Sequence, residues 1–293
     1  LDPNNGDVLA LVSMPDFDPN LFVDGIEVES WRLLNTSERN PLNNRAIQGV
    51  YPPGSTIKPF LAFSALEDNF IDRHFTIDDP GFFKLARSNH IFRDWKKNGH
   101  GIVDLKKAIY QSCDVFFYEL ANKMGINNIF KSMNQFGFGE RTGIDISGEV
   151  EGLLPSKEWK KKRFDQVWYP GDTISVGIGQ GYFLATPIQL AVATSIIANK
   201  GNKVVPKLLL SGGNSQINLV SNFNTESFLS NIEYVKDSMV AVTSSEGTAY
   251  SSGKNLNFKL AGKTGTSQVR RITVAERESE DFRKKEVEWK KRD

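Results

Sequence analysis

The chain has 293 residues, which is enough to bury a substantial core in one large domain or two small ones. Its 36 Lys and Arg side chains nearly balance 35 Asp and Glu, and the net charge of +1 argues against a nucleic-acid-binding surface or a polybasic membrane-binding surface. A single cysteine excludes an internal disulfide, and the longest apolar stretch, residues 190–198, is too short to span a bilayer.

The first part of the chain predicts short strands and one helix. Residues 2–7 have the turn sequence Asp-Pro-Asn-Asn-Gly-Asp, and the apolar residues 8–14 after it predict a β-strand. Residues 55–68 predict a helix. Residues 75–86 carry alternating apolar side chains around the turn signal at residues 79–81, which predicts a small hairpin.

The later part of the chain is predicted to be mainly helical. Helices are expected over residues 127–136, 188–199 and 226–244. The middle one has a threonine cap, a proline at its first position and a glycine beyond its end. Residues 212–215 predict a loop. Charged side chains dominate residues 276–293, which are expected to form a solvated helix or a disordered tail.

The first chemical signal is the pair Ser55 and Lys58, which follows a Pro-Gly breaker at the start of the helix predicted over residues 55–68. Residues i and i+3 share one face of a helix, so the amine can reach the hydroxyl and take its proton. This pair is the minimum apparatus of an activated serine nucleophile. An isolated Ser-x-x-Lys is usually no more than a capped surface helix, so the context decides.

Two further motifs supply that context. Ser112-Cys113-Asp114 lies between a helical pattern at residues 104–111 and an apolar run at residues 115–120. Lys263-Thr264-Gly265-Thr266 falls within residues 258–269, whose alternation predicts a strand. Together they match the S-x-x-K, S-D-N and K-T-G set in order and spacing, except that Asp114 replaces the asparagine. This set indicates a serine acyl-transfer enzyme that reacts with penicillin.

The resemblance extends over almost the whole chain. The sequence is similar to the transpeptidase domain of class B penicillin-binding proteins, and most of all to the elongation-type group, penicillin-binding protein 2. The segments that carry this similarity, besides the motifs, are residues 2–20, 44–50, 93–97, 99–101, 168–173 and 177–182.

The resemblance implies an α/β (α+β) fold of the penicillin-binding protein and serine β-lactamase type. We expect an antiparallel sheet that carries residues 8–14 and 258–269 and packs between helices. A mainly helical part would supply Ser55 and Ser112, and the active site would lie in the cleft between the two parts.

The same resemblance implies roles for the catalytic residues. Ser55 would be the nucleophile and Lys58 its base, with burial and the charge of Lys263 lowering the pKa of Lys58. Ser112 would link the two lysines and relay a proton to the leaving amine. Asp114 would orient Lys58 or the substrate, but its negative charge favours charged Lys58, and the sequence leaves open which effect prevails.

Substrate recognition is expected at the Lys-Thr-Gly segment. Lys263, Thr264 and Thr266 would bind the terminal carboxylate of a peptide ending in D-Ala-D-Ala, because a carboxylate needs a cation and hydroxyl donors. Gly265 would keep the segment open for close approach. Backbone N–H groups of Ser55 and Thr266 would form the oxyanion hole.

Four further residues suggest a metal site. Asp79, Asp94, His100 and Cys113 offer oxygen, nitrogen and sulfur donors that suit Zn²⁺, although their spacing fits no local zinc-binding pattern. Some relatives in the elongation-type group carry a structural zinc near the Ser-x-Asp loop, and these positions match. No cofactor is expected for catalysis, so the zinc would be structural.

The implied function is a peptidoglycan D,D-transpeptidase that cross-links stem peptides through a serine acyl-enzyme and is covalently inhibited by β-lactams. A D,D-carboxypeptidase, a serine β-lactamase of the same fold and a truncated non-catalytic scaffold remain as alternatives. The implied partners are a glycan polymerase and a membrane scaffold of the elongation machinery, with no nucleic acid. The implied location is the bacterial inner membrane, with the catalytic domain in the periplasm.

The resemblance also implies that the chain is a fragment. Relatives carry a membrane anchor and a pedestal region before this segment, and further strands and a closing helix after the Lys-Thr-Gly strand. We therefore expect residues 1–275 to form a transpeptidase domain without its last strands and closing helix, and residues 276–293 to form the charged tail.

Overall fold

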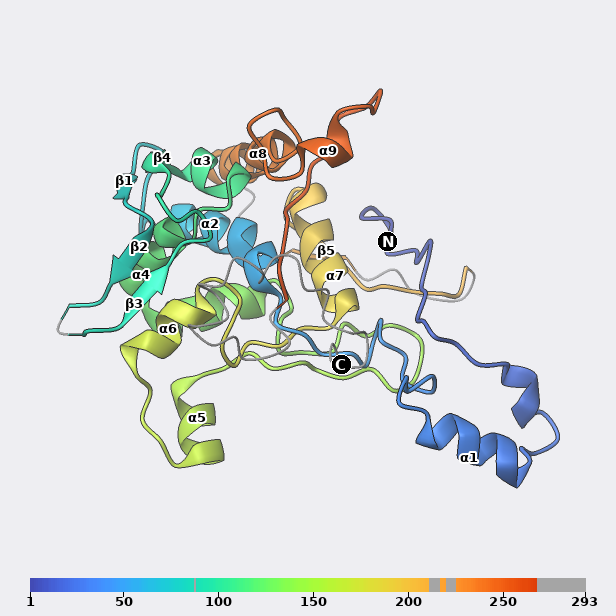
Figure 1. Ribbon diagram of the computed structural model, residues 1–293. Helices are drawn as coiled ribbons and strands as arrows, with labels where there is room; N and C mark the ends of the chain where they lie inside the picture. The colour runs from blue at the N-terminus through green and yellow to red at the C-terminus, as the bar shows by residue number, and fades with distance from the viewer. Residues whose placement is uncertain (87, 211–216, 220–224, 268–293) are drawn as a thin grey trace.

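The computed structural model describes residues 1–86, 88–210, 217–219 and 225–267. Figure 1 shows helices around a central helix α2, with the strands β1 to β4 together on one side and β5 next to α7. The helices are η1 (Pro19–Phe22), α1 (Val28–Thr36), η2 (Gly54–Ile57), α2 (Lys58–Glu67), α3 (Leu105–Tyr110), α4 (Asp114–Gln135), α5 (Lys157–Phe164), α6 (Pro170–Val176), α7 (Pro187–Ala198), α8 (Glu226–Ala241) and α9 (Tyr250–Gly253). The strands are β1 (Thr76–Asp79), β2 (Phe82–Lys84), β3 (Ile91–Arg93), β4 (Gly101–Asp104), β5 (Asn202–Val204) and β6 (Ile217–Leu219).

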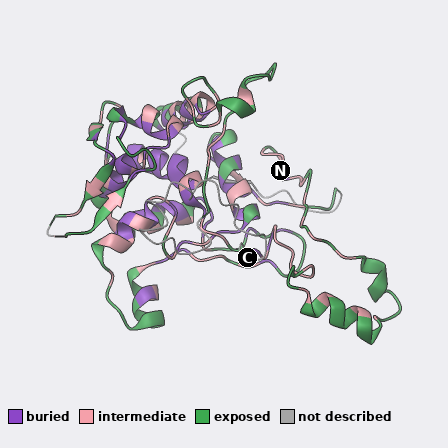
Figure 2. Cartoon of the chain, viewed as in Figure 1, coloured by how far each residue is buried: buried purple, intermediate pink, exposed green. Residues whose placement is uncertain are grey.

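Helix α2 forms the centre of the hydrophobic core. It is buried from Lys58 to Leu66, as its colour in Figure 2 shows. It contacts α3, α4 and α8. Its phenylalanines pack edge to face or tilted on those of neighbouring elements, with ring centroids 5.0 Å apart for Phe60 and Phe136 and 5.1 Å apart for Phe63 and Phe228. This packing fixes the helix whose first residue is Lys58.

The predicted helices are confirmed, with local adjustments at their ends. The segment predicted as a helix over residues 55–68 begins as the 3₁₀ turn η2 and continues as α2. Residues 127–136 belong to the longer α4, which is interrupted where Gly125 adopts non-helical angles. Helix α7 begins with the expected cap, because Thr186 and Gln189 form a reciprocal capping box. The prediction for residues 226–244 corresponds to α8.

The predicted hairpin has the right strands but the wrong partners. Strand β1 pairs with β4, and β2 pairs with β3, both antiparallel, so β1 and β2 do not pair with each other. Gly81, at φ +95°, donates its N–H to the Asp79 side chain and turns the chain out of β1 into a different sheet. Alternating apolar residues indicate a strand but do not specify its partner.

The two strands expected in one sheet are not formed among the described residues. Leu9 and Val12 are 76% and 74% exposed, and the bridge that joins this region to another segment runs from Asp7 to Lys207. Residues 258–267 have no strand assignment, and α8 and the turn after it hold them through the bonds Gly262 N–H to Met239 O and Thr243 Oγ1 to Leu260 O. A strand needs a ladder partner, and the described residues supply none to either segment.

The described part of the chain therefore has an α+β fold with three two-stranded antiparallel sheets in place of one central sheet. The loop predicted at residues 212–215, the end of the strand predicted at residues 258–269, and the tail at residues 276–293 lie outside the described residues. Among the described helices, none is long and apolar enough to cross a membrane.

Candidate active site

The turn that carries Ser55 is pinned from both sides. Gly54, at φ +57°, donates its N–H to Gly179 O over 2.8 Å, and a Cβ at Gly54 would lie 2.5 Å from Thr266 O. A side chain there would push the Thr266 backbone away, so glycine is required at Gly54. Ser55 thus sits where the helical core, the loop at Gly179 and the Lys-Thr-Gly segment meet, directly before the buried α2.

Lys58 is fully buried and its amine is saturated by partners. Its Nζ donates to Asp114 Oδ1 at 2.6 Å, to Ser112 O at 2.9 Å and to Ser112 Oγ at 3.4 Å. The ring of Phe117 lies 5.2 Å away. A buried ammonium is costly without such partners, so the ion pair with Asp114, whose side chain is 15% exposed, lets Lys58 occupy the core.

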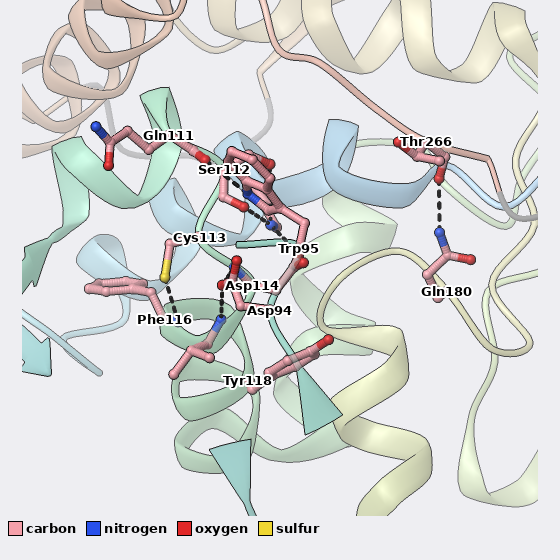
Figure 3. A network of polar contacts seen from close by, with 12 residues as sticks. Asp94, Trp95, Gln111, Ser112, Cys113, Asp114, Phe116, Tyr118, Gln180 and Thr266 are labelled. Carbon is pink, nitrogen blue, oxygen red and sulfur yellow. Dashed lines mark hydrogen bonds and ion pairs between the residues drawn. The ribbon is translucent and has the colours of Figure 1, made fainter. Parts of the chain in front are cut away.

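Ser112 links the two lysines of the site. It lies between α3 and α4 at φ +56°, a left-handed conformation that is rare for serine, and its side chain faces Lys58 and Lys263. Ser112 Oγ is 3.4 Å from Lys58 Nζ and accepts a hydrogen bond of 2.7 Å from Lys263 Nζ. The structure therefore brings together Lys58, Ser112, Asp114 and Lys263 in one polar network, part of which Figure 3 shows.

Lys263 is held in a partly buried position that disfavours its charge. Burial, followed by the positive charge of Lys58, lowers the pKa of Lys263 to about 6. Its Nζ also donates to Thr264 O at 3.0 Å. At neutral pH the amine is therefore mainly uncharged when no substrate anion is bound. A substrate carboxylate beside the amine would favour its protonated form.

The rest of the Lys-Thr-Gly segment lies against the serine turn. A Cβ at Gly265 would be 2.6 Å from Thr56 Cγ2, so this glycine is needed for the contact between the two walls of the cleft. The group that approaches Gly265 closely is therefore the Thr56 side chain of the protein itself. Thr266 O accepts a hydrogen bond of 2.9 Å from Gln180 Nε2, which Figure 3 shows at the far side of the site from Ser112.

Two residues near the network have no role in the sequence prediction. Gln180 fixes Thr266, and Trp95, which is 50% exposed, donates its indole N–H to Gln111 O at 3.2 Å next to Ser112. Both lie within segments that carry the family resemblance, but neither is a motif residue. A single glutamine or tryptophan has no spacing signal that would mark its position.

The four predicted metal-binding residues come together. Asp79, Asp94, His100 and Cys113 are buried, and each offers a donor atom within 4.8 Å of the others. Asp79 Oδ2 is 2.7 Å from His100 Nδ1 and accepts a hydrogen bond from Cys113 Sγ at 3.3 Å. The spacing in sequence gives no pattern because the four residues come from four places: the end of β1, the residue after β3, the residue before β4 and the N-cap of α4.

The electrostatics of this cluster are unfavourable in the absence of a cation. Burial and the nearby Asp94 raise the pKa of the Cys113 thiol, and burial and Asp114 raise the pKa of Asp94. Burial alone would raise the pKa of Asp79, but hydrogen bonds, including those from His100 and Cys113, outweigh it and lower that pKa. His100 Nε2 is buried and has no hydrogen-bond partner. Such an orphaned donor atom beside two carboxylates and a thiol fits a bound metal ion.

The model of the family described as "Penicillin binding protein transpeptidase domain" matches residues 1–281. The chain belongs to this family. Peptidoglycan D,D-transpeptidase MrdA of Acinetobacter baumannii is 47% identical over 285 residues, covering 96% of this chain and 42% of that protein. The MrdA of Escherichia coli K12 is 46% identical over 274 residues, covering 92% of this chain and 43% of that protein.

Solved structures of the penicillin-binding protein family have the same fold. Pseudomonas aeruginosa PBP2 in complex with WCK 5153 superposes with a TM-score of 0.87 at 42% identity and covers 92% of this chain and 59% of its own. Helicobacter pylori PBP2 in complex with MreC gives a TM-score of 0.86 at 38% identity, covering 92% of this chain and 50% of that one. The predicted family and fold class are thereby confirmed. The chain spans less than half the length of the curated relatives it matches.

Proposed function

We propose that the chain is the catalytic part of a peptidoglycan D,D-transpeptidase that acts through a serine acyl-enzyme. The observation that carries the proposal is the position of Ser112 Oγ between Lys58 Nζ and Lys263 Nζ, beside the turn that presents Ser55. Relatives at 46% and 47% identity are named for this activity. Two amines joined by a hydroxyl provide a path for a proton during acyl transfer.

In the first half of the reaction, Ser55 Oγ attacks the carbonyl carbon of the penultimate D-alanine. Its proton enters the network formed by Lys58, Ser112 and Lys263. The network returns a proton to the amine of the terminal D-alanine as the C–N bond breaks, which leaves an ester at Ser55. Asp114 holds Lys58 in place throughout through its ion pair.

The enzyme recognises the donor peptide by its terminal carboxylate. Lys263 and the hydroxyls of Thr264 and Thr266 bind it, and the carboxylate favours the charged form of Lys263. The backbone N–H groups of Ser55 and Thr266 stabilise the oxyanion. In the second half of the reaction, an amine of a neighbouring stem peptide attacks the ester and forms the cross-link. A β-lactam mimics the donor but leaves a persistent acyl group on Ser55.

Intact-mass spectrometry after incubation with benzylpenicillin tests the nucleophile. We expect one adduct on the chain, its loss in Ser55→Ala, and its retention in Ser37→Ala, which removes a half-buried serine directly after α1. Circular dichroism of each variant controls for folding. A folded chain that forms no adduct would contradict the proposal and favour a non-catalytic scaffold. With a peptide donor and acceptor, a cross-linked dimer supports transpeptidation, whereas free acid alone indicates a carboxypeptidase.

We also propose a structural zinc ion held by Asp79, Asp94, His100 and Cys113. Support comes from the convergence of the four buried donors and from the unpartnered His100 Nε2. When bound, the ion would supply positive charge that offsets the two carboxylates and the thiolate. Because Cys113 lies between Ser112 and Asp114 in the chain, a bound ion would also hold the loop that carries these two residues.

Metal analysis of the purified protein tests the zinc proposal. We expect one zinc per chain, its loss in His100→Ala, and a lower thermal midpoint after chelation that zinc restores. His90→Ala is the matched control, because His90 is exposed and lies outside the cluster. Absence of stoichiometric metal from the natively purified protein would rule the proposal out.

The cellular setting is proposed from the relatives. A structure of Helicobacter pylori PBP2 contains MreC, and a peptidoglycan synthase complex that coordinates polymerization and crosslinking matches with a TM-score of 0.79 at 31% identity. These support a membrane scaffold and a glycan polymerase as partners, at the inner membrane with the catalytic domain in the periplasm. Co-purification of both partners with the full-length protein from membranes is the expected result.

A further inference from the structure

The turn after helix α8 contacts the end of α3, two residues before Ser112. Thr248 donates its backbone N–H to Tyr110 O over 3.1 Å, and the Tyr110 hydroxyl donates to Glu246 Oε2 over 3.2 Å. Tyr110 is the last residue of α3, so this turn is anchored to the wall of the cleft that carries Ser112.

The same turn reaches the opposite wall through one side chain. Thr248 Oγ1 lies 2.8 Å from Thr264 Oγ1, the hydroxyl next to Lys263. Thr248 therefore bonds to the Ser112 wall through its backbone and to the Lys-Thr-Gly segment through its hydroxyl. Since the described residues give residues 258–267 no strand partner, bonds to α8 and the turn after it hold that segment.

Hydrogen counting shows what the pair of hydroxyls can do. Each hydroxyl has one hydrogen, and the bond between Thr248 and Thr264 uses one of the two. If Thr248 donates, its hydrogen engages one lone pair of the Thr264 oxygen, and the hydrogen of Thr264 remains available. A donated bond of this kind also polarises the second hydroxyl and strengthens the bond that it gives next.

We propose that Thr248 is a positioning residue that aims the Thr264 hydroxyl at the terminal carboxylate of the substrate. The inference rests on the proposed function, because it assigns the orientation of the pocket that would bind the donor carboxylate. Thr248 touches no reacting atom and acts through Thr264. The ligand class is therefore a peptide or β-lactam with a free carboxylate next to the scissile amide.

The geometry allows the hydroxyl to be tested separately from the turn. The turn is held by Gly247, where any Cβ would collide with Val242 O, and by the bond from Thr248 N–H to Tyr110 O. Thr248→Val keeps the backbone bond and nearly the same shape while removing the hydroxyl. Thr248→Ser keeps the hydroxyl.

The experiment compares acylation of the purified chain by benzylpenicillin and by its methyl ester, which has no carboxylate charge. For Thr248→Val we expect the second-order acylation constant with benzylpenicillin to fall about tenfold, the size of one hydrogen bond to a charged group. The fall is expected in apparent affinity and not in the rate at saturation. The constant for the methyl ester should stay within about twofold, Thr248→Ser should restore the benzylpenicillin constant, and the remote Thr36→Val should change neither.

A double variant supplies the decisive comparison. In the Thr264→Val background, Thr248→Val should have no further effect on benzylpenicillin, because Thr248 acts only through the hydroxyl of Thr264. Equal losses with both reagents, a loss at saturation, or additive effects of the two substitutions would overturn the inference, as would no loss at all. If the unaltered chain forms no Ser55 adduct, the proposed function fails first and this inference fails with it.

Discussion

Gly265→Ala is expected to disable the site by moving one wall of the cleft. A Cβ at Gly265 would lie 2.6 Å from Thr56 Cγ2, whereas ordinary contact begins at 3.4 Å, so the wall must shift by about 0.8 Å. Thr56 cannot rotate its methyl away without losing the 2.6 Å bond from Oγ1 to Pro53 O. A displacement of about 1 Å between reacting groups costs about 100-fold in rate, so we expect a 10- to 100-fold slower acylation by benzylpenicillin.

A second substitution tests the cause of that loss. Thr56→Ser removes the methyl group but keeps the hydroxyl that bonds Pro53 O, so it should restore most of the acylation rate in the Gly265→Ala background. Thr56→Ser alone should acylate at nearly the normal rate. The measurement is the second-order rate constant from time-resolved intact mass. Gly265→Ala acylating within about threefold of the unaltered chain, or no recovery in the double variant, would refute this reasoning.

Two further predictions concern charged groups. Asp172→Asn leaves the buried ammonium of Lys160 without its anion, so the free energy of unfolding in urea should fall by about 3 kcal/mol, whereas Asp165→Asn at the exposed pair with Lys161 should change it by less than about 0.5 kcal/mol. Equal losses would contradict the role of burial. Because the pKa of Lys263 is about 6, its charged fraction in the free chain falls as pH rises above 6. The apparent affinity for benzylpenicillin should therefore weaken from pH 6 to pH 8 and level off below pH 6, and a flat profile would show that this lysine does not bind the carboxylate.

The sequence predicts which residues of the site come together better than it predicts the strands around them. Local motifs predict Lys58, Ser112 and Lys263, and two of these motifs lie at helix starts that the sequence marks. Gly54 is the first residue of η2, and Cys113 caps the first turn of α4. Local signals of this kind depend on neighbouring residues alone and can be found without knowing the fold.

Strand partners could not be found in the same way. Residues 82–84 pair with residues 91–93, and residues 76–79 pair with residues 101–104. The β2–β3 pair thus lies in the sequence between β1 and its partner β4, whereas a simple hairpin would pair β1 with β2. Thr248 and Gln180 were missed for the same reason, since their contacts with Thr264 and Thr266 join segments 16 and 86 residues apart. Such contacts depend on tertiary packing, which one sequence does not encode as a local pattern.

The start of helix α4 connects the cluster of Asp79, Asp94, His100 and Cys113 to the polar network around Lys58. Asp94 Oδ2 accepts the backbone N–H groups of Asp114 and Val115 at 2.6 and 3.1 Å, and Cys113 Sγ accepts that of Phe116 (Figure 3). The positive end of the helix dipole partly offsets the repulsion between the carboxylates of Asp94 and Asp114.

That offset is incomplete, because the pKa of Asp94 remains raised by burial and by the nearby charge of Asp114. Two cations together can neutralise the remaining repulsion between Asp94 and Asp114. Lys58 neutralises Asp114 from the catalytic side, and a divalent ion would neutralise Asp94 from the other side. Loss of the ion would then leave Asp94 a weaker acceptor for the first N–H groups of α4, the helix whose first residue orients Lys58. Loss of the ion is therefore expected to loosen the position of Lys58 as well, although Lys58 is no ligand of the proposed ion.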